Sequence, residues 1–183
     1  MIEAPDYVLQ AHQAFIEAGA RIVTTNSYAV VPFHIGEQRF ASDGARLAAL
    51  ALLMLRVAAG GFLLPHALGK LFGWFNGPGL AGFAGELRGF GLPASAPLPL
   101  LLAVLQVVAG LAVLLGWQTH AAALAGAAFI AFTALLALPR GWFWMHGGME
   151  YPVMWTLLLL SVALAGAGTF SLDSFLASPG VPS

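Results

Sequence analysis

Three long apolar stretches without a charged residue constrain this chain more than any other feature. They span residues 97–116, 121–138 and 152–170. The hydrocarbon core of a bilayer is about 30 Å thick, and roughly 20 apolar residues in helical form cross it. A helix also satisfies its own backbone hydrogen bonds, which lipid cannot do. The stretches therefore predict membrane-spanning helices.

The composition divides the chain into a polar beginning and an apolar remainder. Of the 183 residues, 60% are hydrophobic and only 8% are charged, whereas soluble domains carry about 25% charged residues. Most of the charged residues lie within residues 1–56. We expect a short N-terminal extension over residues 1–46, followed by an all-α membrane domain over residues 47–176.

The expected architecture is a four-helix transmembrane bundle. Its helices cover residues 47–74, 97–116, 120–138 and 151–170. The first contains Arg56 and Lys70, but at 1.5 Å per residue it exceeds the membrane thickness, so both cations can reach the headgroups. Residues 79–91 predict a short surface helix with Phe83, Leu87 and Phe90 facing lipid.

Charge and cysteine usage narrow the function classes. The net charge of -1 gives no footprint for nucleic acid. The absence of cysteine excludes thiol catalysis, disulfides and thiolate-bound zinc. The histidines lack a ligand spacing, so no metal site is predicted.

We expect no cleavable signal peptide, an inner (plasma) membrane location and cytoplasmic termini. The positively charged residues divide evenly between the two sides of the membrane, so they do not decide the orientation.

Polar side chains at membrane depth are costly and therefore mark candidate sites. His66 and Lys70 lie near the end of the first predicted helix, and His146 and Glu150 near the start of the fourth. Alternating helices bring these ends to one membrane surface, and Gln106 of the second helix is a further ligand-binding candidate. Such groups can bind a carbonyl or quinone oxygen and move protons. The alternative is an interfacial Lys70–Glu150 ion pair with the histidines beside lipid headgroups.

Residues 53–173 resemble the DoxX family of small four-helix membrane proteins. The matching pieces are Arg56, LPHALGKLFG (64–73), LQVVAGL (105–111), GGME (147–150) and GAGTFSLD (166–173). Gln106 stands where such proteins often carry glutamate. Arg56 and Asp173 are expected to be structural or interfacial.

The DoxX resemblance also implies a function, because relatives are linked to quinone-coupled sulfur oxidation and to oxidoreductase complexes that handle thiol stress. It implies an accessory or quinone-interacting subunit rather than a stand-alone enzyme. No covalent cofactor is expected, and the partners would be lipid and either other chains of a redox complex or further copies of this chain. A small-solute transporter or channel is the alternative.

A second resemblance falls at the beginning of the chain. EAGARIVTTNSY (17–28) and FHIGEQRF (33–40) resemble the homocysteine S-methyltransferase family, a β/α barrel that holds zinc with cysteines. The residues predict a helix ending near residue 18, a strand over 21–25 and a helix over 42–52. A barrel needs roughly 200 residues or more, and this chain has no cysteine, so we expect a methyltransferase-like fragment without that activity.

Overall fold

The computed structural model describes residues 37–95 and 97–177, together with the single positions 10 and 13. These residues form helices and connecting turns, and none of them is in a strand. The strand predicted over 21–25 lies outside the described residues, and so does the helix before it, apart from positions 10 and 13. The chain divides into two compact units between Ala48 and Ala49, and the arrangement described below is that of the second unit.

The first described helix, α3, spans Glu37–Phe72. It covers both the helix predicted over residues 42–52 and most of the first predicted span. It continues through Pro65 and ends two residues earlier than predicted. The end has a local cause, because Gly73 adopts a left-handed φ of 75° and the short helix η2 (Trp74–Asn76) follows.

Helices α5 (Leu98–Leu115) and α6 (Thr119–Ala137) form a hairpin. Gly116 ends α5 with a φ of 70°, and the Trp117 amide donates to the Ala112 carbonyl at 2.8 Å. This is the helix-ending pattern that a left-handed glycine permits. Together with α3, these two helices are long and apolar enough to cross a membrane.

Helix α7 spans Glu150–Ala165 and is shorter than predicted. Its 16 residues correspond to a length of about 24 Å. The prediction of helix up to residue 170 is wrong because Gly166 and Gly168 take positive φ values of 84° and 70°. The chain then turns and forms α8 (Leu172–Ala177).

Helix α4 (Gly79–Gly89) confirms the short helix between the first two spans, but its expected orientation is wrong. Phe83 and Leu87 are buried and pack with Ala103 of α5 and Leu71 of α3. They therefore face protein, not lipid. Phe90 is half-buried, and the guanidinium of Arg140 lies 4.5 Å from the centre of its ring.

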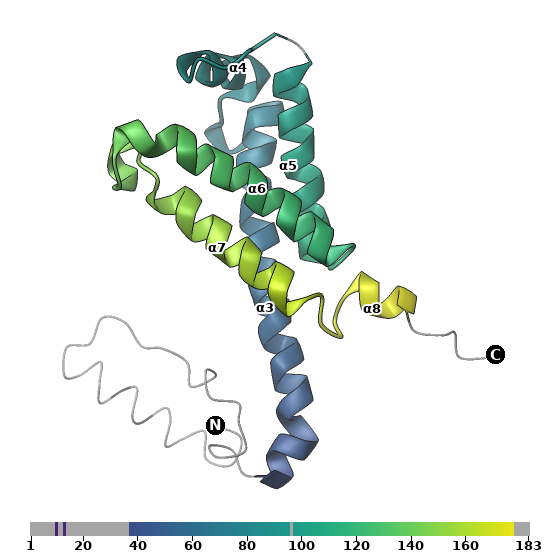
Figure 1. The fold of residues 1–183 in the computed structure, drawn as a ribbon. Coiled ribbons are helices and arrows are strands. Elements are labelled where there is room, and N and C mark those ends of the chain that lie inside the picture. Colours follow the sequence, from purple (N-terminus) through teal and green to yellow (C-terminus); the bar gives the residue numbers. More distant parts are fainter. Residues whose placement is uncertain (1–9, 11–12, 14–36, 96, 178–183) are drawn as a thin grey trace. The chain divides into compact units, whose positions relative to one another are not determined.

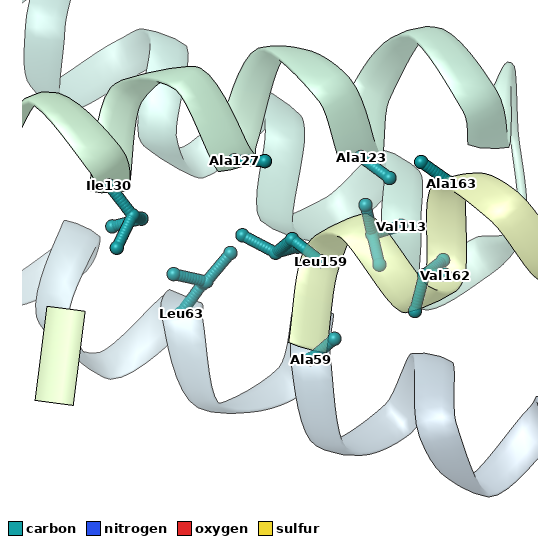
Figure 2. Packing of buried hydrophobic residues seen from close by; sticks show 9 residues of the cluster. All are labelled: Ala59, Leu63, Val113, Ala123, Ala127, Ile130, Leu159, Val162 and Ala163. Atoms are coloured by element: carbon teal, nitrogen blue, oxygen red, sulfur yellow. The ribbon is translucent and has the colours of Figure 1, made fainter. Parts of the chain in front are cut away.

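The main core lies between α3, α5, α6 and α7 (Figure 1). Figure 2 shows its nine side chains pointing toward one another from these four helices. Small residues allow the close approach: a Cβ added at Gly60 would lie 2.5 Å from the Leu114 amide nitrogen of α5, and one added at Gly126 of α6 would touch Leu159 of α7 at 3.4 Å. Such contacts are typical of membrane helices.

Candidate functional site

A cleft of about 380 Å³ opens beside the end of α3. It is lined by residues of α3, of η2, of the turn before α4 and of α4 itself: Pro65, His66, Gly69, Lys70, Trp74, Phe75, Gly77, Pro78 and Glu86. The chain can fold back here because two glycines, Gly69 and Gly77, lie in close contact. A Cβ added at Gly77 would lie only 2.4 Å from the Cα of Gly69.

Lys70 carries the positive charge of this cleft and is held from three sides. Its ammonium donates to Oε1 of the buried Gln106 at 3.3 Å. The same nitrogen lies 4.7 Å from the ring centre of Phe83 and 5.7 Å from that of Phe129. Aromatic faces attract a cation without neutralising it. The arrangement therefore fixes the ammonium group, and these three neighbours do not neutralise its charge.

Two further ionisable groups line the cleft. His66 lies one helical turn before Lys70, as the sequence spacing indicates, and its side chain is exposed. Glu86 of α4 supplies the carboxylate. Sequence reasoning missed Glu86, because α4 was expected to lie on lipid. A signal was available in the sequence. Glu86 lies three residues after Phe83, so the two side chains are near the same side of a helix, and Phe83 contacts Lys70.

His146 and Glu150 do not line this cleft. His146 belongs to the short helix η4 (Trp144–His146) and is exposed. The Glu150 carboxylate accepts a hydrogen bond from the Trp144 amide at 3.2 Å, and the rings of Trp144 and Tyr151 stack 5.3 Å apart. The structure thus groups His66, Lys70 and Gln106 with Glu86, and it places Glu150 at the first position of α7.

A second polar cluster surrounds Arg56, which lies on α3 fourteen residues before Lys70. Arg56 is only 1% exposed, and its Nη2 donates to the Phe170 carbonyl. Its Nε and Nη1 have no hydrogen-bond partner within the described part of the chain. The Gly116 turn makes room for the guanidinium, since a Cβ there would overlap Nη1.

Asp173, the first acidic residue of α8, belongs to the same cluster. Its Oδ1 accepts from the Gln118 amide at 2.7 Å, and its Oδ2 accepts from the amide and hydroxyl of Thr119 at 2.9 and 2.8 Å. Burial alone raises the pKa of Asp173, but the bonds from Thr119 and Gln118 and the nearby His120 outweigh it. The pKa of this carboxyl therefore lies below its ordinary value.

Among the residues that the structure describes, no three histidine, aspartate or glutamate side chains gather as a metal site would require. In the cleft, Lys70, His66 and Glu86 can supply hydrogen bonds and exchange protons. Trp74 and Phe75 add exposed aromatic surface at the same place.

Comparison with known proteins confirms both resemblances. A family model described as DoxX matches residues 51–147, more than half of the chain. A family model described as homocysteine S-methyltransferase matches residues 1–87. This second match extends past the N-terminal extension through α3 and into α4, farther than the sequence motifs indicate. No curated protein and no solved structure matches.

Proposed function

Since this chain belongs to the DoxX family of membrane proteins, we propose that it is an accessory subunit of a membrane redox complex and that the cleft beside Lys70 binds a quinone. The observation that carries the proposal is the fixed ammonium group of Lys70, which Gln106 and two aromatic rings hold at the cleft. Within this proposal the chain sits in the plasma (inner) membrane with both termini in the cytoplasm.

The cleft has the chemistry that a quinone head group requires. A quinone is a flat ring with two carbonyl oxygens, so it needs hydrogen-bond donors and an apolar or aromatic surface. Lys70 and His66 supply the donors, and Trp74 and Phe75 supply aromatic surface. The volume of about 380 Å³ falls within the usual range of small-molecule sites.

An accessory role fits the residue inventory better than independent catalysis. The chain contains no cysteine, so it offers no thiolate for an iron–sulfur cluster. Electrons for a bound quinone would therefore come from a partner chain. The part of this chain would be to hold the head group and to exchange protons through His66 and Glu86.

Binding of a short-chain ubiquinone analogue to the purified protein in detergent tests the proposal. We expect the analogue to raise the unfolding temperature of the wild type. Lys70→Met should abolish the rise and His66→Ala should reduce it, because each removes a donor from the cleft. His146→Ala is the matched control, since this exposed histidine lies outside the cleft, and it should keep the full rise. Equal responses in all four proteins would overturn the proposal.

A further inference from the structure

The segment after α7, residues 166–177, is attached to the rest of the bundle in an unusual way. Its helix α8 contributes no buried residue to the protein. Phe175 and Leu176 are 75% and 68% exposed. Apolar packing within the protein therefore does not explain why this segment lies where it does.

Polar links from Asp173 provide the attachment instead. The Asp173 amide donates to the Gly116 carbonyl at 2.8 Å. Its carboxylate accepts three hydrogen bonds from Gln118 at the end of the α5–α6 turn and Thr119 at the start of α6. Hydrogen bonds to a charged group are stronger than those between neutral groups. One carboxylate thus accepts three of the four hydrogen bonds that join Asp173 to the turn.

The attached segment covers the guanidinium of Arg56. The Phe170 carbonyl of the segment accepts from Nη2, and Asp173 also acts on Arg56 electrostatically. A Cβ at Gly116 would meet both Arg56 and the Ser171 side chain, so the turn, the arginine and the segment are packed together. A buried cation needs such compensation because it has lost its hydration.

We propose that residues 166–177 form a strap that closes over Arg56 and is fastened by the charge of Asp173. Neutralising this carboxylate releases the strap from the α5–α6 turn and exposes the guanidinium at that end of the bundle. The groups that face Asp173 are Arg56 from α3 and Thr119 and His120 from α6. The strap lies apart from the Lys70 cleft and does not depend on the function proposed for it.

Amide hydrogen exchange of the full chain in detergent tests the strap. In Asp173→Asn, which keeps the shape and removes the charge, exchange over residues 166–177 should become about tenfold faster, as expected for the loss of charge-assisted bonds. Reaction of Arg56 with phenylglyoxal should rise in parallel. Exchange in α6 and α7 should stay as in the wild type. Glu150→Gln is the matched control and should change neither measurement.

Unchanged exchange over residues 166–177 in Asp173→Asn would overturn the proposal, and so would faster exchange without greater reactivity of Arg56. If Asp173→Asn loosens α6 and α7 as well, Thr119→Val decides the question. This variant removes one donor to the carboxylate and keeps the size of the side chain. A rise confined to residues 166–177 supports the strap, and no rise overturns it.

Discussion

The stretch of α3 from Arg56 to Lys70 carries one cation at each end, and the surroundings of the two cations differ. At one end, the Lys70 ammonium borders an open cleft, and a neutral amide and two aromatic rings hold it. At the other end, Arg56 is fully buried, donates to the Phe170 carbonyl and interacts electrostatically with the anchored carboxylate of Asp173. The comparison teaches that neighbouring helices decide whether a cation of a membrane helix borders an open cleft or is buried away from any ligand.

The largest expected effect concerns the closed end. Gly116→Ala should lower the free energy of unfolding by about 2–5 kcal/mol, because the added methyl group overlaps the Arg56 guanidinium and alanine is strained at this backbone conformation. Titration with sodium dodecyl sulfate in mixed micelles measures the change. Gly91→Ala is the matched control: Gly91 also has a positive φ of 72°, but a Cβ there meets nothing within 4 Å. The control should lose only about 1–2 kcal/mol. Equal losses in the two variants would contradict the claim that overlap with the Arg56 guanidinium destabilises Gly116→Ala.

The next effect concerns the open end and the acceptor of Lys70. Gln106→Leu should lower the free energy of unfolding by about 1–3 kcal/mol, because the partly buried ammonium loses its hydrogen-bond partner. A double-mutant cycle provides the control. In the Lys70→Met background the same substitution should cost clearly less, since no cation remains to be satisfied. Additive losses would show that Gln106 contributes by packing alone.

The sequence predicts the apolar helices well because length and hydropathy are local properties. Helices α5 and α6 begin and end within one residue of their predicted limits. The end of α7 was missed because residues 166–170 remain apolar while two glycines reverse the backbone. The inward face of α4 was missed because an amphipathic helix has the same pattern whether it meets lipid or protein.

In the two candidate sites, too, the sequence predicts contacts between neighbouring residues of one helix but not contacts between distant segments. The neighbourhood of His66 and Lys70 follows from a four-residue spacing on one helix. The link from Asp173 to Gln118 and Thr119 joins positions more than fifty residues apart, and no periodicity of either segment indicates it. Glu86 was missed for the related reason that its place beside Lys70 depends on how α4 folds back onto α3.

The third prediction is a dependence on pH at the closed end. Because the folded-state pKa of Asp173 is lowered, its ionised form stabilises the fold. This contribution is fully present above the ordinary aspartate value of about 3.9 and is lost as the pH falls through the lowered value. The unfolding temperature of the wild type should therefore drop in acid, and that of Asp173→Asn should drop less. Parallel acid profiles of the two proteins would contradict the role given to this carboxylate.

The smallest effect is expected from the carboxylate at the open end. Glu86 is exposed and lines the cleft, so Glu86→Gln should change the free energy of unfolding by less than about 0.5 kcal/mol, as is usual for surface substitutions. Asp173→Asn, measured in the same micelles, should cost more, because the Asp173 carboxylate accepts three hydrogen bonds from the α5–α6 turn. A loss in Glu86→Gln as large as in Asp173→Asn would mean that the Lys70 end is also held closed by its carboxylate. Lys70 would then be a structural ion-pair partner rather than a donor kept available for a ligand.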